Sequence, residues 1–409
     1  MPLIVQKYGG TSVGSAERIQ NVARRIMATQ AEGNQVVAVV SAMSGETNRL
    51  TDLASEVTGE LHPTEREMDV LLATGEQASI ALMSMAINAM GGKAISFTGA
   101  QAGISTDGAH TRARIANITP SEVHKYLDDG TIVILAGFQG TGPDGRITTL
   151  GRGGSDLTAI AIASAINADL CQIFTDVDGV YTCDPRIVPN AVKLDEISYD
   201  EMLEMASSGT KVMQSRSVEF AKKFGVVFEV RSSLNNNPGT IVKEETVNME
   251  SIVIRGVSVE RDQAKVTIEE VPDTPGIASQ VFKAIADAGL VIDMIVQNVS
   301  KIGSTDISFT LYAKDLPKAE AALQPLLNTI GDKVVVEAKS GIAKLSAVGI
   351  GMRSHSGVAS KMFDALADVN VNIQMISTSE IKVAVIINES EIKTASRAVH
   401  DAFSLEQSS

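Results

Sequence analysis

Short apolar runs alternate with longer amphipathic stretches from residue 1 to about residue 245. Because these runs are hydrophobic on both faces, they predict fully buried strands, at residues 3–5, 35–40, 131–135 and 170–174. Helical spacing between them predicts helices around residues 17–31 and 157–166. Buried strands separated by helices are typical of a mostly parallel sheet covered on both faces. The pattern therefore predicts an α/β domain.

This domain is predicted to end near residue 245. Residues 232–239 read SSLNNNPG, a run of turn formers. Residues 240–242 predict one last strand, and the polar stretch at residues 243–250 predicts a linker. We therefore assign residues 1–245 to the α/β domain.

An internal repeat occupies the last third of the chain. GIASQVFKAIAD at residues 276–287 aligns with GVASKMFDALAD at residues 357–368. The register continues, with Ile292 on Ile373 and Met294 on Met375. The apolar residues of both aligned segments recur at helical spacing, which predicts one helix in each copy.

Strand-like runs flank the predicted helix of each copy. One run precedes the helix and two follow it, at residues 264–268, 291–296 and 306–312 in the first copy and at residues 344–350, 371–376 and 383–387 in the second. This order begins a ferredoxin-like βαββαβ unit. We predict two such modules, at residues 264–338 and 344–409, which together form a tandem sensing unit.

The composition is that of a globular protein, with 44% hydrophobic and 21% charged residues. A length of 409 residues suggests two or three domains. The formal charge of −14 excludes a broad basic surface for nucleic acid or an anionic membrane, although a small basic pocket remains compatible with it. We expect neither nucleic acid nor membrane as a partner.

A cytoplasmic location is predicted from what the sequence lacks. Cys171 and Cys183 have no CxxC spacing and read as two reduced thiols. The N-terminus has no signal-peptide pattern, and the most apolar stretch, residues 159–166, is far shorter than the ~20 residues that span a bilayer. The five histidines are scattered, so we expect no metal site built by the protein alone.

A glycine-rich turn follows the first predicted strand, in the segment KYGGTSVG at residues 7–14. Glycines let the backbone approach a ligand closely, and amides at a helix start bind anions. Ser15-Ala16 stands where a P-loop requires Lys-Ser/Thr, so this turn is not a P-loop. It is either a purely structural turn or a phosphate site, and the preceding Lys7 favours the phosphate site.

A second glycine-rich loop, GRGGSD at residues 151–156, leads into the predicted helix at residues 157–166. Asp156 can be read simply as a carboxylate at the helix N-terminus. Arg152, however, lies among three glycines, and a guanidinium fork on a small loop suits a carboxylate ligand. The loop therefore predicts a site for an acidic small molecule.

Three further segments are weak signals when each is taken alone. TGEQ at residues 74–77 is predicted to open a helix, where Glu76 could be a first-turn glutamate favoured by the helix dipole. SAMSG at residues 41–45 follows a strand, and residues 175–186 combine turn formers with a tyrosine and an arginine.

As an ordered set, these motifs resemble the aspartate kinases of the amino-acid kinase family: KYGGTSVGS, VVSAMSGETNRL, TGEQ, LGRGGSD, FTDVDGVYTCDPR and SGTKVM. The C-terminal repeat resembles their paired ACT domains. The resemblance spans nearly the whole chain. It implies a three-layer kinase fold with a mostly parallel central sheet, followed by two ferredoxin-like ACT modules.

The resemblance also implies an activity, ATP-dependent phosphorylation of the aspartate β-carboxylate. The enzyme would be a phosphotransferase with a carboxyl group as acceptor, at the first step of lysine, threonine and methionine biosynthesis. An ionised β-carboxylate needs no general base at pH 7. The reaction needs in-line positioning and charge neutralisation by a lysine, backbone amides and Mg²⁺, so ATP with Mg²⁺ is expected.

Catalytic roles follow from the matching motif positions. Lys7 would stabilise the transferring phosphoryl group, and Asp156 would orient Lys7. Arg152 would clamp the α-carboxylate of aspartate, and Glu76 would meet its ammonium group. Pairing the two ends of a small zwitterion in this way holds it rigidly for reaction.

Binding roles are carried over in the same way. The nucleotide is expected against Lys7, Tyr8, Gly9, Gly10, Ser41, Thr175, Asp176, Tyr181, Arg186 and Lys211. Aspartate is expected against Thr11, Ser44, Gly45, Thr47, Glu76, Arg152, Gly153, Gly154 and Ser155. Ser12, with Thr11, would help to shape both sites.

The resemblance places amino-acid effectors at the strand–turn–helix edges of the ACT modules. The expected contacts are Asp273, Pro275, Gly276, Ile277, Ala278, Gln297 and Asn298 in the first module and Gly357, Val358, Asn372 and Ile373 in the second. Ser356 stands where relatives commonly have proline, which loosens the second turn. Lysine and threonine, alone or together, are the expected effectors.

Three alternatives to this interpretation stay open. The chain could be another amino-acid or carbamate kinase of the same fold, or a catalytically inactive sensor, although Lys7, Arg152 and Asp156 argue against a sensor. The repeats could serve only as a dimerisation platform. We expect the chain to form a homo-oligomer. We also expect Met249 in the linker to serve as an internal translation start that gives a separate, shorter regulatory chain.

Overall fold

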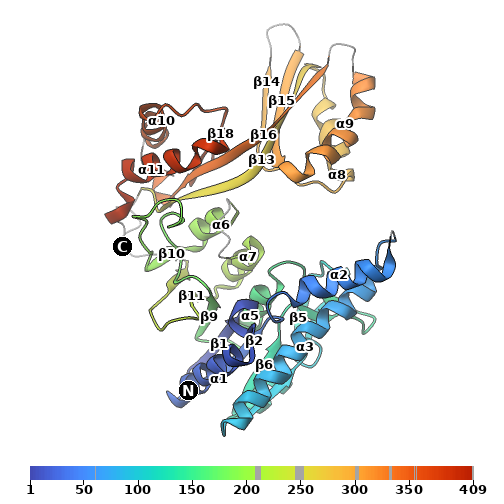
Figure 1. Ribbon diagram of the computed structural model, residues 1–409, viewed down its shortest axis with the longest axis vertical. Helices are drawn as coiled ribbons and strands as arrows, with labels where there is room; N and C mark the ends of the chain where they lie inside the picture. Colours follow the sequence, from blue (N-terminus) through green and yellow to red (C-terminus); the bar gives the residue numbers. More distant parts are fainter. Residues whose placement is uncertain are drawn as a thin grey trace.

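The computed structural model describes residues 1–59, 61–207, 213–244, 253–299, 304–330, 334–353, 355 and 357–407. Figure 1 shows two bodies along the long axis, an N-terminal body coloured blue to green and a C-terminal body coloured yellow to red. Three residues named above, Lys211, Met249 and Ser356, lie outside the described residues.

An eight-stranded sheet forms the centre of the N-terminal body, in the order β10-β12-β11-β9-β1-β2-β6-β3. Its middle consists of the predicted strands β1 (Leu3–Tyr8), β2 (Gln35–Val40), β6 (Ile132–Ala136) and β9 (Leu170–Thr175). These four pair in parallel, whereas β11 (Phe228–Ser232) and β12 (Thr240–Lys243) pair antiparallel. The predicted mostly parallel sheet is confirmed.

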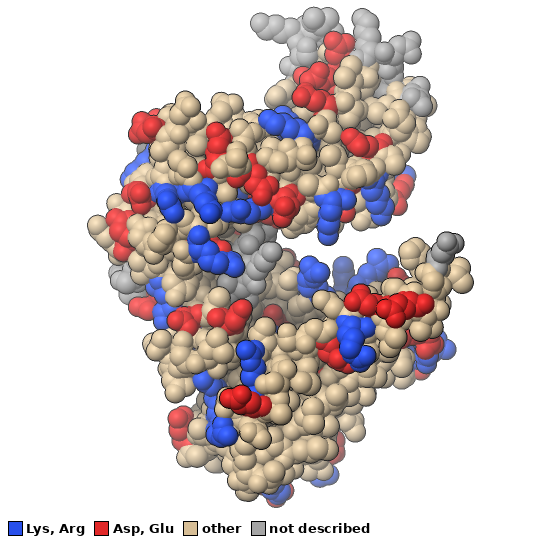
Figure 2. Space-filling view, viewed as in Figure 1, with Lys and Arg blue, Asp and Glu red and all other residues tan. Residues whose placement is uncertain are grey.

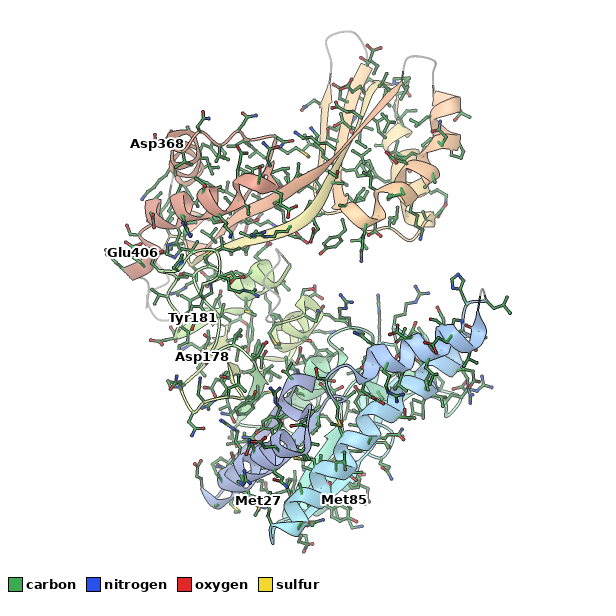
Figure 3. The ribbon with its side chains drawn as sticks, viewed as in Figure 1. Met27, Met85, Asp178, Tyr181, Asp368 and Glu406 are labelled. Carbon is green, nitrogen blue, oxygen red and sulfur yellow. The ribbon has the colours of Figure 1, made fainter. Side chains whose placement is uncertain are left out.

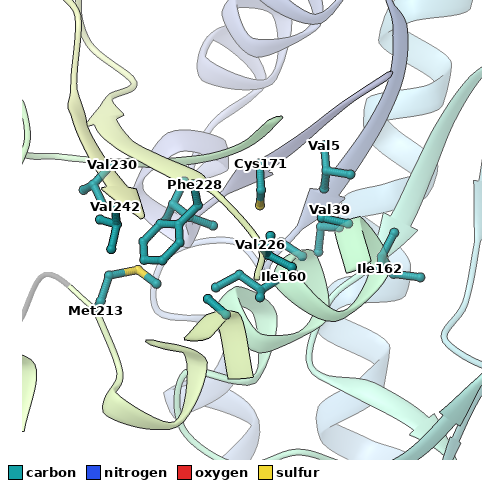
Figure 4. Close-up of a cluster of buried hydrophobic side chains, with 14 of the residues drawn as sticks. Val5, Val39, Ile160, Ile162, Cys171, Met213, Val226, Phe228, Val230 and Val242 are labelled. Carbon is teal, nitrogen blue, oxygen red and sulfur yellow. The ribbon is translucent and has the colours of Figure 1, made fainter. Parts of the chain in front are cut away.

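Helices cover both faces of this sheet, because alternate residues of each strand face opposite ways. Val37 and Val39 of β2 belong to one core, which includes the helix α5 (Gly154–Ala165). Figure 4 shows part of this core, with Val39 close to Ile160 and Ile162. Val36, Ala38 and Val40 of β2 face the helices α1 (Ala16–Ala31) and α3 (Glu65–Ala89). Burial on both faces explains why the strands read as unbroken apolar runs.

The long helix α3 corrects one prediction, because residues 74–77 lie inside it and do not open a helix. Gly75 is required there, since a Cβ at this position would lie only 2.9 Å from the Cβ of Ala42. Among the described helices, α3 alone is long and apolar enough to cross a membrane by length and composition. Its buried face carries Asp69 and Glu76 and packs on the sheet, so it is a core helix of this domain.

The other elements of the N-terminal body are all shorter than α3. They are α2 (Glu46–Thr58), β3 (Ala94–Phe97), α4 (Ser121–Asp128), β10 (Glu196–Ser198), α6 (Tyr199–Ser207) and α7 (Ser215–Phe224). A second sheet, β5-β4-β7-β8, contains β4 (Ile104–Thr106), β5 (Ile115–Ile118), β7 (Gln139–Thr141) and β8 (Ile147–Thr149). The last of these strands leads directly into the loop at residues 151–156.

A six-stranded sheet, β14-β15-β13-β16-β18-β17, forms the C-terminal body. Its strands are β13 (Gly256–Pro272), β14 (Ile295–Val299), β15 (Ser304–Tyr312), β16 (Val335–Val348), β17 (Met375–Thr378) and β18 (Lys382–Asn388). The helices are α8 (Ile277–Asp287), α9 (Leu316–Ile330), α10 (Val358–Asp368) and α11 (Ile392–Ala402). Both repeat helices, α8 and α10, fall where the sequence predicts them.

The two central strands are shared between the modules. The second half of β13 pairs with the first half of β16, from Lys265 with Lys339 to Glu269 with Val335. The first half of β13, from Gly256 to Glu260, pairs with the second half of β16. Both halves of the sheet then have the strand order of a ferredoxin-like unit. The fourth strand of the second module therefore precedes the first module in the chain.

Two predicted strands begin later than expected. Residues 291–296 and 371–376 are predicted as strands, but β14 begins at Ile295 and β17 at Met375. Val291 is mostly exposed, so its hydrophobicity does not mark a core position. The predicted strand at residues 344–350 ends at Val348, and a 3₁₀ turn follows at Ile350–Arg353.

Polar contacts join the two bodies. Glu201 of α6 faces Arg255 at 3.8 Å and accepts the N–H of Ile350 at 3.2 Å. The N–H of Val257 donates to the carbonyl of Thr182 at 2.7 Å. Beyond this junction, Figure 2 shows an open notch between the bodies, with Lys and Arg side chains on both edges.

Candidate active site

The carboxyl ends of β1, β2, β6 and β9 meet at one edge of the sheet, because these strands are parallel. This edge is where α/β proteins bind their ligands. The loops at residues 7–14, 41–45 and 175–186 leave the sheet here, and the loop at residues 151–156 enters α5 beside them. The fold therefore brings together four motifs that are far apart in the sequence.

Lys7 and Asp156 form an ion pair at this edge. The Nζ of Lys7 lies 2.7 Å from Oδ1 of Asp156, and the two side chains are only 12% and 13% exposed. Asp156 lies in the first turn of α5, where the helix dipole also favours a carboxylate. A cation from β1 and an anion from α5 are thus held together with little solvent around them.

The first glycine turn packs closely against the end of β2. A Cβ on Gly10 would lie 2.8 Å from the carbonyl oxygen of Ala42, and one on Gly14 would lie 3.2 Å from Cβ of Ser44. A Cβ on Gly9 would lie 3.4 Å from Nζ of Lys7. These glycines leave the main chain open around the lysine ammonium, as a phosphate ligand requires.

Glu76 reaches this edge from α3 and is 4% exposed. One carboxylate oxygen accepts the N–H of Ala42 at 3.0 Å, and the other has no hydrogen-bond partner among the described residues. Burial raises the pKa of Glu76 to about 7, although the bond from Ala42 acts in the opposite direction. A buried oxygen without a partner is suited to receive a ligand cation.

The GRGGSD loop is shaped by its glycines. Gly151 and Gly153 adopt φ values of 78° and 73°, and a Cβ on Gly153 would overlap the side chain of Gln214. Ser155 is buried against Gly137, whose added Cβ would lie 2.6 Å from Oγ of Ser155. Arg152 is exposed, and no ion pair to it is found within the described part of the chain. Its guanidinium is therefore available to a ligand.

The predicted aspartate loop after β2 lies next to the glycine turn. Gly45 has φ 82° and precedes α2, which contains Thr47 in its first turn. Ser44 is placed beside Gly10 and Gly14 by the contacts described above. Thr11 lies in the intervening 3₁₀ turn, Gly10–Val13. The structure thus places these predicted substrate residues at the same edge as Lys7.

The predicted nucleotide residues divide into two groups. Ser41 donates its N–H to the carbonyl of Tyr8 at the end of β1, and Thr175 ends β9 with its hydroxyl 3.1 Å from Oδ1 of Asp176. These three lie at the sheet edge. Arg186 is different, because its side chain is 87% exposed and pairs with Asp184 at 2.7 Å.

Tyr8 and Tyr181 also differ from each other. Tyr8 is fully buried, stacks on Phe174 and donates its hydroxyl to Oε1 of Gln6. Only its main chain is open to a nucleotide. Tyr181 is half-buried and forms an isolated β-bridge with Lys193, so its ring is partly accessible.

Asp69 is a residue that sequence reasoning missed. It is fully buried on α3, where it accepts the hydroxyl of Thr149 at 2.5 Å and the N–H of Thr111 at 3.0 Å. The ring of His110 lies 2.6 Å away. Asp69 therefore ties α3 to the strand that leads into the Arg152 loop. Its spacing of two helical turns from Glu76 was an available signal.

A small cavity of about 240 Å³ borders the glycine turn. Ser12 lies on its wall together with Arg18, Arg25 and Leu234. Both arginines already bind main-chain carbonyls, Arg18 that of Thr11 and Arg25 that of Asn235. The two arginines place positive charge on the α1 side of the glycine turn.

A larger cavity, about 460 Å³, lies in the first module. It is lined by the residues Pro272, Asp273, Thr274, Pro275, Gly276, Ile277, Ala278, Gln297, Thr305 and Ile307. Six of the seven residues predicted for the first effector site are among them, and Asn298 is not. In the second module, Gly357 has φ 89° and precedes α10, where Val358 is buried. Asn372 and Ile373 lie in the segment before β17.

Comparisons with known proteins match three segments of the chain to two families. The model of the amino acid kinase family matches residues 2–231, and ACT domain models match residues 266–330 and 345–403. An aspartate kinase of Pseudomonas fluorescens is 53% identical over 407 residues, covering 99% of this chain and 98% of that protein. This chain belongs to the aspartate kinases of the amino acid kinase family. The family resemblance, fold class and phosphotransferase class predicted from the motifs are confirmed.

Other relatives extend the comparison. An aspartokinase of Corynebacterium glutamicum is 50% identical over 410 residues, covering 99% of this chain and 97% of that protein. Among solved structures, E. coli aspartokinase III in complex with aspartate and ADP has a TM-score of 0.80 at 25% identity, covering 98% of this chain and 99% of that one. Its complex with lysine and aspartate has a TM-score of 0.79 at 26% identity, with the same coverage.

Proposed function

We propose that this chain transfers the γ-phosphoryl group of ATP to the β-carboxylate of aspartate. The observation that carries the proposal is the shielded Lys7–Asp156 ion pair, placed between two glycine-rich loops at the carboxyl edge of the sheet. E. coli aspartokinase III, a structural relative, has been solved with aspartate and ADP. The reaction is proposed as the first step of lysine, threonine and methionine biosynthesis, in the cytoplasm.

In this mechanism the protein positions reactants and neutralises charge. Lys7 lies on the phosphoryl oxygens, and Asp156 keeps its ammonium group aimed at them. Open main-chain amides at Gly9 and Gly10 add further donors. The carboxylate of Asp156 is the type of hard oxygen ligand that would help to hold the Mg²⁺ of the nucleotide, and the ion would supply further charge neutralisation.

Aspartate is held at both ends. The guanidinium of Arg152 takes the α-carboxylate, and the unpartnered oxygen of Glu76 takes the ammonium group. The β-carboxylate is already ionised at pH 7, so it attacks phosphorus without a general base. Thr11, Ser44, Gly45, Thr47 and Ser155 complete the pocket.

The acceptor specificity tests this function. ADP release should require aspartate, and glutamate or carbamate at the same concentration should give less than a tenth of that rate. A preference for another acceptor would make the chain a different kinase of the same fold. No ADP release with any acceptor would make it an inactive sensor.

The pH dependence of aspartate use should report the ionisation of Glu76. Its pKa of about 7 means that only the ionised fraction can pair with the substrate ammonium group. We expect kcat/KM for aspartate to rise roughly tenfold between pH 6 and 8 and then level off. In Glu76→Gln this rise should be lost and KM for aspartate should be high throughout.

Two controls accompany the pH profile. The ATP profile of the same enzyme at saturating aspartate should lack the Glu76 limb. The free energy of unfolding gives the second control. The pKa of Glu76 in the folded chain lies above the ordinary 4.5, so this carboxyl group stabilises the folded state most below pH 4.5. That contribution is lost as the pH rises through 7. An unchanged limb in Glu76→Gln would contradict the assignment.

The tandem modules are proposed to bind lysine or threonine and to inhibit the kinase. The cavity of about 460 Å³ in the first module joins the acidic Asp273 to the amides at the start of α8, so it offers groups for both ends of an amino acid. E. coli aspartokinase III has been solved with lysine in a T-state. Inhibition requires only that the effector bind one kinase conformation more tightly than another.

Effector titration tests this regulation. Lysine and threonine, alone and together, should lower the rate of the full chain several-fold to about a hundredfold. Asp273→Ala should blunt that response without lowering the uninhibited kcat, and Asp287→Ala at the exposed end of α8 is the matched control. No response to either amino acid at millimolar concentration would leave the modules as a dimerisation platform.

We also propose a homo-oligomer and a second translation product that begins at Met249. This methionine comes before the strand β13 in the sequence, and β13 completes both modules, so a chain starting there would contain every strand of the six-stranded sheet. Mass spectrometry of the untagged native protein should detect both chains. Detection of full-length chains alone would reject the internal start.

A further inference from the structure

The C-terminal end of α11 contains a buried histidine whose second ring nitrogen is unused. His400 has no solvent exposure. Its Nε2 lies 2.9 Å from the hydroxyl of Thr182 in the N-terminal body, and its Nδ1 has no hydrogen-bond partner among the described residues. A buried polar atom without a partner is costly, so it points to a ligand.

Two carboxylates surround this nitrogen. Oδ1 of Asp401 lies 3.9 Å from Nδ1, which is beyond hydrogen-bond distance. Glu406, in the 3₁₀ turn Leu405–Gln407, completes the group, and one ligand atom from each of the three residues lies within 4.8 Å of the others. In Figure 3, Glu406 lies at the end of the red segment, beside the N-terminal body and above Tyr181.

The hydrogen bond on the far side of the ring is compatible with a free lone pair on Nδ1. The hydroxyl oxygen of Thr182 already accepts the N–H of Val192 at 3.0 Å, and it has a second lone pair for an Nε2–H donor. A neutral ring with Nε2–H bonded to oxygen is the usual state of a metal-ligating histidine.

We propose that His400, Asp401 and Glu406 bind a divalent transition-metal ion such as Zn²⁺. Ligand atoms bonded at about 2 Å to one tetrahedral ion lie about 3.3 Å apart, so the 3.9 Å between Nδ1 and Oδ1 needs only a small inward movement of the Asp401 carboxylate. Asp401 and Glu406 are exposed, so their carboxylates can rotate inward, and a fourth position remains for water. Two carboxylates and an imidazole suit zinc, whereas Mg²⁺ prefers oxygen ligands alone.

The position gives the ion a structural consequence. Asp401 also accepts a hydrogen bond from Asn190 of the N-terminal body at 3.4 Å, and the Thr182 contact lies within the predicted nucleotide segment at residues 175–186. A bound cation also meets the negative end of the α11 dipole. The ion would therefore stabilise the contact between the second module and residues 175–186 of the N-terminal body.

Metal binding to the full chain tests the site. Protein stripped with a chelator and freed of nucleotide and Mg²⁺ is titrated with Co²⁺ as an optical probe, and Zn²⁺ is then added as competitor. We expect one Co²⁺ per chain, displaced by Zn²⁺ and not by millimolar Mg²⁺. The same ion should raise the Tm of the wild-type chain.

The exposed carboxylates allow variants that keep the fold. Asp401→Asn and Glu406→Gln should each weaken Co²⁺ binding at least about tenfold and abolish the Tm shift, while Glu320→Gln on α9 should behave as wild type. The proposal is overturned if no Co²⁺ binds. It is also overturned if Asp401→Asn and Glu406→Gln bind Co²⁺ as tightly as the wild type and the control do, since the ion would then lie elsewhere.

Discussion

Replacing Lys7 with alanine should lower kcat about 10²–10³-fold while leaving the fold intact. Lys7 is the cation at the centre of the proposed phosphoryl site, and losing one preorganised electrostatic contact of this kind costs a factor of that size. Steady-state rates at saturating ATP and aspartate, with the Tm and circular dichroism of the same sample, check the result.

The matched control is Lys93→Ala. Lys93 is also paired with an aspartate in the N-terminal body, but its side chain is 61% exposed and the residue directly precedes β3, at the amino ends of the parallel strands and away from the candidate site. This variant should keep nearly full activity. Turnover near that of the wild type in Lys7→Ala would remove Lys7 from the mechanism.

Replacing Arg152 with alanine should damage aspartate use most. A charge-assisted guanidinium–carboxylate contact is worth about 1.5–3 kcal/mol, so kcat/KM for aspartate should fall roughly 10- to 150-fold. KM for ATP should stay close to the wild-type value, because the clamp touches only the amino acid. Initial rates with one substrate varied at a time measure both constants.

Asp69→Asn should also lower kcat/KM for aspartate, but by a smaller factor than Arg152→Ala. Asp69 touches no substrate, but it holds Thr149 and Thr111 beside the Arg152 loop, so it acts as a positioning residue. Arg146→Ala, an exposed arginine in the turn before β8, is the control for Arg152. Unchanged aspartate KM and kcat in Arg152→Ala would contradict the clamp.

The strands and the two modules could be predicted because their pattern is set by burial. Parallel strands covered on both faces, such as β2 and β6, must be apolar along their whole length. The helices α8 and α10 have similar sequences, so the repeat located both. The candidate site was predicted from motifs, and the fold places most of them at one edge.

What could not be predicted depends on contacts between distant segments. The pairing of residues 256–260 with the end of β16 joins a strand to a module that comes later in the chain. Asp69 matters only because Thr149 and Thr111 reach it across the fold. The sequence predicted Glu76 at the start of a helix. In the structure α3 begins earlier, at Glu65, so Glu76 lies inside the helix.

The central claim is tested most directly by identifying the phosphorylated product. An acyl phosphate reacts with hydroxylamine, so the full chain is incubated with ATP, Mg²⁺, aspartate and hydroxylamine, and ADP and hydroxamate are measured together. Transfer to the β-carboxylate predicts one β-aspartyl hydroxamate for each ADP, with both absent when aspartate is omitted. ADP formed without β-aspartyl hydroxamate, or at the same rate without aspartate, would contradict it.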